Sequence, residues 1–329
     1  MALAAVAFAL IAAGSVSAGA HRAAAAPQAP RGLLLVTAAP RAGGTVRAQL
    51  VARRAAVPRA TTSLYEHTVG RRALRRQGCR AAKRGLSGIV ILDFGQPAYN
   101  GHAYGTTLFS GLFAGNRPIT RALLAYGGGY VYCLRRGSRA HIALARGTSN
   151  YRPQVPSSYR AGRKWAREAR ALTALLARHG LDAHVTSAAA DDVEPAWDRS
   201  FRRTRDFFRG YADARTGHLL YNYGSLDGGV GGIWSAHQAF YVASGMRYSR
   251  ALPEIYTRKM ATQWASLALK ARRLYHRPLR FAGVLTTRQA GTRFLRPREA
   301  HRALVHALTS YMSAAPAVPA TLTNIRWSE

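Results

Sequence analysis

The chain has 329 residues, 48% of them hydrophobic, which is enough to bury a sizeable core and excludes an intrinsically disordered protein. Its net charge is +34, and all but four of the 48 basic residues are arginine. The arginines are spread along the chain without a recognised nucleic-acid-binding motif, so we expect no specific nucleic-acid partner.

The N-terminal segment indicates export. Residues 1–20 are apolar and alanine-rich and end in small residues, which is typical of a secretory signal peptide, although their first positions lack the usual positive charge. An N-terminal membrane anchor is the alternative. Residues 21–60 are rich in Ala, Arg, Pro and Gly, which predicts a disordered linker. We therefore expect a secreted or cell-envelope-associated protein, which its positive charge would attract to anionic envelope polymers.

The only two cysteines, Cys79 and Cys133, are candidates for a disulfide in an exported protein, the alternative being two buried free thiols. Neither cysteine lies in a zinc-binding spacing, the histidines show no metal-ligand spacing, and the glycine runs lack a phosphate-binding frame. We expect no metal and no other cofactor.

Between residues 61 and 312 the chain alternates short β-prone runs with helical patterns, which predicts an α/β fold. The number and spacing of the runs favour a single (β/α)8 TIM barrel, with residues 313–329 as a C-terminal tail. The predicted strands are Ile89–Asp93, Tyr130–Cys133, His141–Ala145, His184–Asp191, Leu219–Tyr223, Ala239–Ser244, Leu252–Tyr256 and Phe281–Thr286.

One spacing disagrees with a regular barrel. Only seven residues separate Cys133 from His141, which is too few for the crossover helix that joins parallel strands. We therefore expect the barrel to be irregular in its early half.

Two helices are patterned clearly. Trp165, Ala169, Leu172 and Leu176 recur at helical spacing, so they predict one buried face. A second pattern begins after Asp198, which is a candidate N-cap.

Acidic residues are concentrated in one short run. The chain has only 14 Asp and Glu residues, and four of them lie between positions 191 and 198. Side chains alternate along a strand, so Asp192 and Glu194 are expected to point the same way, about 6–7 Å apart. Two such carboxyl groups suit acid and base catalysis on a glycosidic bond. Binding of a hard metal ion, or ion pairs with the many arginines, are the alternatives, and we expect Asp191 and Asp198 to serve the scaffold.

Further polar residues follow the other predicted strands. In a TIM barrel the active site lies at the C-terminal ends of the strands, where Asp93 joins Asp192 and Glu194 as a candidate catalytic residue. At the same edge, amide side chains can form hydrogen bonds with the hydroxyl groups of a sugar, and aromatic side chains can pack on its faces. The candidate substrate-binding residues are Tyr221, Asn222, Tyr241, Glu254, Gln263 and Trp197.

These segments resemble a secreted, largely actinobacterial group of glycoside-hydrolase-like TIM-barrel proteins of unknown activity. The resemblance covers residues 61–312 in order. It is carried by Gly78-Cys79, Ile91 to Gly95, Tyr130-x-x-Cys133, Ala143 to Asn150, Ala190 to Trp197, Tyr221 to Gly224, Tyr241 to Ser244, Leu252 to Tyr256 and Gln263-Trp264.

The order of an Asp at the end of the first predicted strand, an Asp-x-Glu at the end of a middle strand, and Tyr-rich strand ends is more loosely similar to the family 25 type of lysozyme. That likeness implies Asp93, Asp192 and Glu194 as the catalytic rim, with Glu194 as general acid. Asp191 and Pro195 depart from the lysozyme pattern.

We therefore expect a monomeric, exported protein that hydrolyses glycosidic bonds in cell-wall or environmental polysaccharide, such as peptidoglycan. Glu194 would be the general acid, and Asp192 or Asp93 the second carboxylate. The alternative is a non-catalytic glycan-binding or cell-surface interaction module on the same scaffold.

Overall fold

The computed structural model describes residues 60–287, 294–320 and 322–328. Within these residues, eight parallel strands follow one another around a sheet in chain order. They are β1 (Ala60–Tyr65), β2 (Gly88–Asp93), β6 (Ile142–Ser149), β7 (Val185–Asp192), β8 (Leu220–Tyr223), β9 (Ser249–Ala251), β10 (Val284–Thr287) and β11 (Leu322–Trp327). The last strand, β11, pairs with both β10 and β1.

The sheet closes between β9 and β10. The backbone N–H of Ala251 donates to the carbonyl of Arg280 at 2.9 Å, and the N–H of Ile255 donates to the carbonyl of Leu285 at 2.9 Å. Parallel bridges at the same place join Ala251 to Phe281 and Glu254 to Leu285. The protein is therefore an α/β barrel of the (β/α)8 type, as the sequence predicted.

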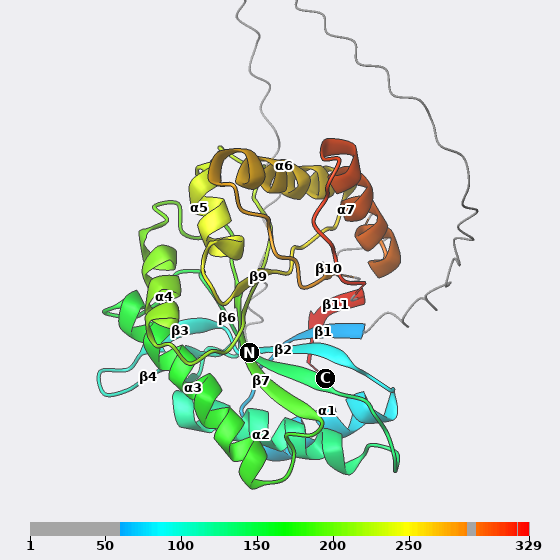
Figure 1. Ribbon diagram of the computed structural model, residues 1–329. Helices are drawn as coiled ribbons and strands as arrows, with labels where there is room; N and C mark the ends of the chain where they lie inside the picture. The colour runs from blue at the N-terminus through cyan, green and yellow to red at the C-terminus, as the bar shows by residue number, and fades with distance from the viewer. Residues whose placement is uncertain (1–59, 288–293, 321, 329) are drawn as a thin grey trace, which may run out of the picture. The chain divides into compact units, whose positions relative to one another are not determined.

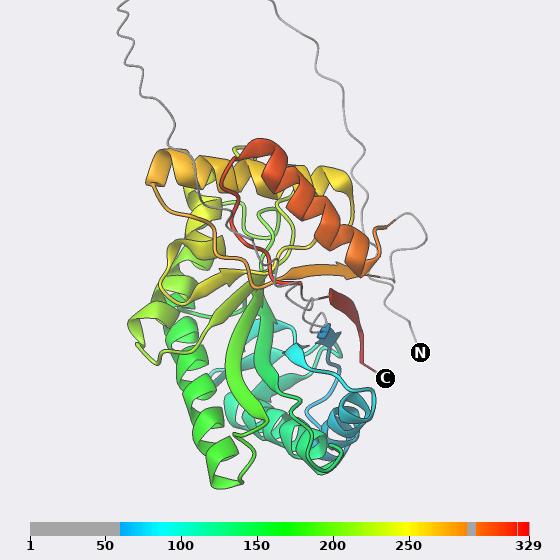
Figure 2. The ribbon, with the colours of Figure 1, turned by 45° about the vertical axis from the view of Figure 1, so that its right-hand side comes forward.

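Helices lie outside the strands (Figures 1 and 2). Their apolar faces cover the outer side of the barrel; on α3 these are the predicted residues Trp165, Ala169, Leu172 and Leu176, all buried. The helices are α1 (Arg71–Lys83), α2 (Asn116–Tyr132), α3 (Ser158–Arg178), α4 (Arg202–Asp213), α5 (Ala236–Phe240), α6 (Arg258–Tyr275) and α7 (Pro297–Tyr311), and a π-helical turn (Tyr241–Gly245) continues α5.

A separate core fills the inside of the barrel. Side chains alternate between the two faces of each strand, so Ile91, Ala145, Tyr221 and Leu285 pack inward in one cluster. Burying each large apolar side chain stabilises the fold by about 1.5–3 kcal/mol.

The barrel is irregular in its early half, as predicted. An antiparallel sheet of β3 (Gln96–Tyr99), β4 (Tyr104–Thr107) and β5 (Phe113–Gly115) is inserted between β2 and α2. The reason differs from the expected one, because Tyr130–Cys133 is not a strand but the end of α2 and the residue after it. The short segment before His141 is thus the loop from α2 to β6.

Two other strand predictions were also wrong. Ala239–Ser244 lies in α5 and the π-helical turn, and Leu252–Tyr256 follows β9 instead of forming it. Short apolar runs have the same composition in a buried helix and in a buried strand, so periodicity alone could not separate them. Of the eight barrel strands, the predictions missed β1, β9 and β11, whereas β2, β6, β7, β8 and β10 were found.

The predicted domain limits need one correction. The segment 313–329, expected to be a tail, contains β11 and hence a wall of the barrel. Its β-branched and aromatic residues suit a strand. The sequence does not predict this strand because no further helical pattern follows α7 to continue the alternation of strands and helices. The predicted signal peptide (1–20) and residues 21–59 of the predicted linker lie outside the described residues.

A disulfide joins Cys79 on α1 to Cys133 after α2, with 5.0 Å between the Cα atoms and 54 residues of sequence separation. This confirms the predicted pairing. Closing a loop of that length stabilises the folded state by about 4 kcal/mol in the chain-entropy description. No helix among the described residues is long and apolar enough to cross a membrane.

Candidate active site at the carboxyl ends of the strands

Four carboxyl groups meet where the barrel strands end. Asp93 and Asp192 are the last residues of β2 and β7, Glu194 lies two residues beyond β7, and Glu254 follows β9. Parallel strands place their carboxyl ends at one edge, so distant parts of the sequence converge there. The carboxyl groups influence one another electrostatically: Glu254, Glu194 and Asp93 all raise the pKa of Asp192. The structure thus brings the three predicted catalytic residues together with Glu254.

Asp93 is fully buried, and both of its carboxyl oxygens accept hydrogen bonds. The hydroxyl of Tyr223 on β8 donates to Oδ2 at 2.5 Å, and the backbone N–H of Gly95 donates to Oδ1 at 2.8 Å. Burial raises the pKa of Asp93 to about 7, against the lowering effect of these two bonds. A carboxyl group whose oxygens are both engaged suits a positioning role.

Asp192 is only 2% exposed but has an open acceptor. The hydroxyl of Tyr65 on β1 donates to Oδ2 at 3.2 Å, whereas Oδ1 has no hydrogen-bond partner among the described residues. Burial, and then the neighbouring carboxyl groups, raise the pKa of Asp192 well above its ordinary value. An unpartnered buried oxygen is costly unless a ligand or water completes it.

Glu194 is the cluster member that reaches toward solvent, because it is half-buried whereas the others are buried. Its backbone is held by Asn150, whose Oδ1 accepts from the Glu194 N–H at 3.1 Å and whose Nδ2 donates to the Glu194 carbonyl at 3.2 Å. The backbone N–H of Ser225 donates to its carboxyl group, and the Ser225 hydroxyl, which donates to Oδ1 of Asp227 at 2.7 Å, lies beside it.

The pKa of Glu194 is raised to about 9, first by burial and then by Glu254 and Asp227, against the lowering effect of Ser225. After burial, the carboxyl group of Glu254 contributes most to this rise in pKa. At neutral pH Glu194 is therefore a protonated acid, as a general acid must be.

Glu254 is 3% exposed, and the hydroxyl of Tyr256 donates a hydrogen bond to it. Burial raises its pKa to about 7. Its carboxyl group lies close enough to Asp192 and Glu194 to raise the pKa of both. Glu254 was predicted to bind substrate. Its place in the cluster is compatible with contact to a ligand that Asp192 and Glu194 also contact.

No described arginine forms an ion pair with this cluster. The ion pairs among the described residues are Arg146–Glu168 on the helix side of β6 and Arg205–Asp206 on α4. In a chain of net charge +34, a group of acids that excludes arginine is unusual for a purely structural role. The described residues also contain no group of His, Cys, Asp and Glu side chains placed to hold a metal ion.

The remaining predicted substrate-binding residues are scattered. Tyr221 points into the barrel core below Tyr223, whereas Asn222 lies on the opposite, helix-facing side of β8. Tyr241 lies on the π-helical turn and packs against Phe201, with ring centroids 6.1 Å apart, because its segment is helical and outside the barrel.

Gln263 and Trp197 lie near the rim of the barrel. Gln263 is on α6, next to Gly229 of the glycine-rich loop that follows β8. Trp197 lies after β7 and contacts Tyr151, which follows β6, with ring centroids 5.5 Å apart. Both side chains are partly exposed.

The two acids expected to serve the scaffold differ. Asp198 accepts hydrogen bonds from the backbone N–H and the hydroxyl of Thr204, at 2.9 and 3.1 Å, and thus satisfies the first turn of α4. Asp191 is buried on the outer face of β7, but no described arginine pairs with it, and its Oδ1 has no described partner.

Three tyrosines of the site were not predicted: Tyr65, Tyr223 and Tyr256. Each one lies at or just beyond the end of β1, β8 or β9 and donates its hydroxyl to one carboxyl group of the cluster. The β-branched run before Tyr65, Thr61-Thr62, together with the acid after it, Glu66, is the signal that could have revealed the first of them.

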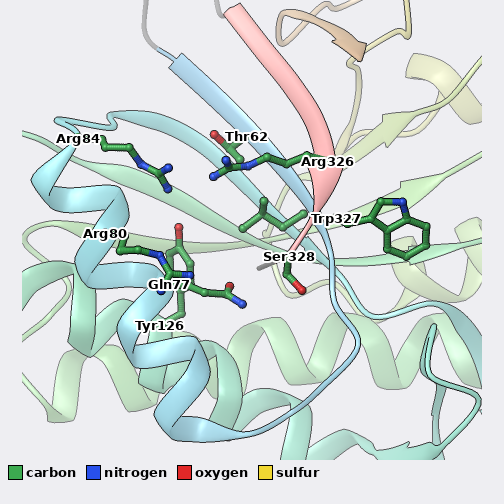
Figure 3. A pocket seen from close by; sticks show the side chains of 9 residues that line it. Thr62, Gln77, Arg80, Arg84, Tyr126, Arg326, Trp327 and Ser328 are labelled. Carbon is green, nitrogen blue, oxygen red and sulfur yellow. The ribbon is translucent and has the colours of Figure 1, made fainter. Parts of the chain in front are cut away.

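A small pocket lies on the outside of the barrel, between α1 and the outer sides of β1 and β11 (Figure 3). Arg80, Arg84 and Arg326 line it. The ring of Trp327 points away from these arginines (Figure 3). Glu66, fully buried nearby, accepts from Nε2 of Gln77 at 3.2 Å, and burial raises its pKa to about 7.

The fold and the site define a (β/α)8 barrel with a buried cluster of carboxyl and tyrosine side chains at the carboxyl ends of its strands. No protein-family model and no curated protein matches the sequence. Among solved structures, the chain is similar to a protein from Labrenzia alexandrii described as a candidate mandelate racemase/muconate lactonizing enzyme, with a TM-score of 0.31 and 11% identity over 82% of this chain and 55% of that one. The chain thus spans about half the length of that protein. The fold assignment stands on the strand order and hydrogen bonds given above.

Proposed function

We propose that the protein is a glycoside hydrolase that cleaves polysaccharide, with Glu194 as general acid and Asp192 as the second carboxylate. The observation that supports this proposal is the cluster itself: four carboxyl groups at the catalytic end of a barrel, unpaired with any described arginine, one of them protonated at neutral pH and partly exposed. Carboxyl groups in unequal environments are the requirement for acid and base chemistry on one bond.

In this mechanism Glu194 gives its proton to the glycosidic oxygen while the bond from that oxygen to the anomeric carbon breaks. Asp192, ionised, stabilises the positive charge that develops on the ring or accepts the proton of the attacking water. The products are an alcohol and a sugar with a free reducing end, and Glu194 regains a proton from solvent. Asp93, with both oxygens engaged, holds Tyr223 in place and does not react.

The raised pKa values set the pH range of this reaction. Asp192 must be ionised, so activity rises with pH as it loses its proton, and it falls where Glu194 loses its proton, at about pH 9. We expect an optimum displaced to the alkaline side of that of a carboxyl pair with ordinary pKa values.

The proposal includes export to the cell envelope. The disulfide Cys79–Cys133 is compatible with an oxidising compartment. The charge of +34 would attract the protein to anionic envelope polymers, with peptidoglycan or another polysaccharide as substrate.

The test is the release of reducing ends from purified peptidoglycan and from a panel of soluble polysaccharides by the wild type and by Glu194→Gln. We expect at least about a hundredfold loss of rate in the variant. Asp182→Asn is the matched control, because Asp182 is exposed just before β7, at the other end of the barrel, and its removal should leave the rate unchanged. Equal rates in the wild type and Glu194→Gln would refute the catalytic assignment.

A glycan-binding module without catalysis is the second candidate. It is favoured by the depth of the cluster, since Asp93 and Asp192 are 0% and 2% exposed. In that case neither protein releases reducing ends, while both bind the same glycans.

A further inference from the structure

Aromatic side chains form a continuous group from the carboxyl cluster to the surface. The ring of Tyr65, whose hydroxyl donates to Asp192, lies 5.0 Å from the ring of Phe109 and 5.2 Å from that of Trp327. Trp327 stacks on His67 at 4.8 Å, with an interplanar angle of 16°. We call these four residues, Tyr65, His67, Phe109 and Trp327, the first platform.

The first platform is partly open to solvent. Trp327 is 41% exposed, and its ring points away from the arginine-lined pocket on the outside of the barrel (Figure 3). Phe109 comes from the connection between β4 and β5, where Leu112 is 68% exposed. Large aromatic and apolar side chains kept at the mouth of a polar site are typical of ligand contact.

A second, smaller group lies at another part of the rim. Tyr151 follows β6 and Trp197 follows β7, both are partly exposed, and their rings are 5.5 Å apart. We call this pair the second platform. In the barrel the order of strands places β2 between the two platforms on one side, and β8, β9 and β10 on the other. The two platforms therefore lie on different sides of the barrel, at the end where the carboxyl cluster also lies.

We propose that the two platforms hold successive rings of one polysaccharide chain that lies across the carboxyl cluster. A pyranose whose hydroxyl groups are equatorial has flat faces of C–H bonds that pack on aromatic rings. Its hydroxyl groups project from the edge of the ring. The proposed ligand is thus a chain of β-linked hexopyranoses long enough to contact both platforms, because β-1,4 links keep such a chain extended with its ring faces exposed. The inference rests on the proposed function as a glycoside hydrolase. It adds Trp327 and Phe109 to the residues that contact the polysaccharide, and it states the length of ligand that the site requires.

The test measures binding separately from hydrolysis. The protein carries Glu194→Gln, and the probes are the hexamer and the dimer of β-1,4-linked N-acetylglucosamine and of β-1,4-linked glucose, with Kd from calorimetry. For at least one hexamer, Trp327→Ala and Trp197→Ala should each raise Kd about tenfold, with a smaller effect on the dimer. Tyr132→Ala is the control, because Tyr132 is an aromatic residue 77% exposed on α2, and its removal should not change Kd.

One further variant and one further measurement keep the result interpretable. Trp327→Phe retains an aromatic face and should restore most of the affinity, and thermal unfolding of each variant shows whether Trp327→Ala has folded. The inference is overturned if no hexamer binds, or if folded Trp327→Ala and Trp197→Ala bind the hexamers as tightly as the parent. Hexamer binding that depends on both platforms, without release of reducing ends by the wild type, would support the inference and refute only the hydrolase proposal.

Discussion

The hydroxyl of Tyr223 donates a 2.5 Å hydrogen bond to Oδ2 of Asp93, and so joins the ends of β8 and β2 across the barrel. Both residues are 0% exposed. The bond is made inside the barrel wall, where water cannot replace it. It is therefore the contact that keeps the floor of the candidate site in place.

Removing this hydroxyl should destabilise the protein. Tyr223→Phe leaves a buried carboxyl oxygen without its donor, so we expect the free energy of unfolding to fall by about 1–3 kcal/mol in urea denaturation. Tyr221→Phe is the matched control, because Tyr221 points into the same core from the same strand and donates to no carboxyl group of the cluster. Equal losses in the two variants would contradict the role given to the Tyr223–Asp93 bond.

Neighbouring aspartates on β7 should differ in function. Asp192→Asn removes the carboxylate that faces the cluster, and we expect at least about a hundredfold loss in the rate of polysaccharide hydrolysis. Asp191→Asn should keep the rate within about twofold, because Asp191 is on the other face of the strand and Asn resembles the protonated acid that burial favours. Reducing-end release by both variants measures this. Equal losses of rate would show that the face of β7 on which an aspartate lies does not determine its role in hydrolysis.

Stability should depend on pH in the direction opposite to that of an ordinary salt-bridged protein. The pKa values of Glu66, Asp93 and Glu254 are each raised to about 7, so the folded state holds protons that the unfolded state releases near pH 4. Their contribution to stability is complete below about pH 4 and is lost as the pH rises through about 7. Urea denaturation at a series of pH values should show the free energy of unfolding falling over this window.

A variant separates this effect from the repulsion among the arginines. Asp93→Asn cannot ionise, so the fall in stability between about pH 4 and 7 should be smaller than in the wild type. An identical slope in the two proteins would mean that Asp93 does not titrate as the structure indicates.

Helix packing around the disulfide should be intolerant of a single methyl group. A Cβ at Gly129 on α2 would lie 2.0 Å from the backbone carbonyl oxygen of Arg75 on α1. Gly129→Ala should therefore lower the free energy of unfolding by about 1–3 kcal/mol or more. Gly128→Ala, one residue away, has its nearest contact at 4.0 Å and should stabilise α2 by up to about 1 kcal/mol. Thermal unfolding of both variants would test this, and a destabilised Gly128→Ala would contradict the packing described.

The sequence predicted most of the fold, because strands such as Ile89–Asp93 and His184–Asp191 are apolar runs between well-patterned helices. It could not predict β11, since its pairing with β1 is a contact between segments more than 250 residues apart. The helical character of Tyr130 was hidden by the three glycines before it, of which Gly129 packs closely against α1 and none ends the helix.

The sequence predicted the acidic residues of the candidate site but not its tyrosines. Asp192 and Glu194 stand out because acidic residues are scarce in this chain. Tyr65 and Tyr256 do not stand out among 16 tyrosines, and only the closed barrel brings their hydroxyl groups to the carboxyl groups. Asn222 lies on the face of β8 opposite to Tyr221 and Tyr223, because neighbouring side chains alternate along a strand.

The pairing of β1 with β11 also determines when the site can form during synthesis. The chain emerges from its N-terminus, so β1 has its β2 neighbour early but lacks its other neighbour until residues 322–327 have been made. Tyr65 and Trp327 lie at the carboxyl ends of these two strands, and their rings meet only after this last pairing. The rim that carries the proposed chemistry is therefore incomplete in a nascent chain until residues 322–327 have been made and have paired with β1.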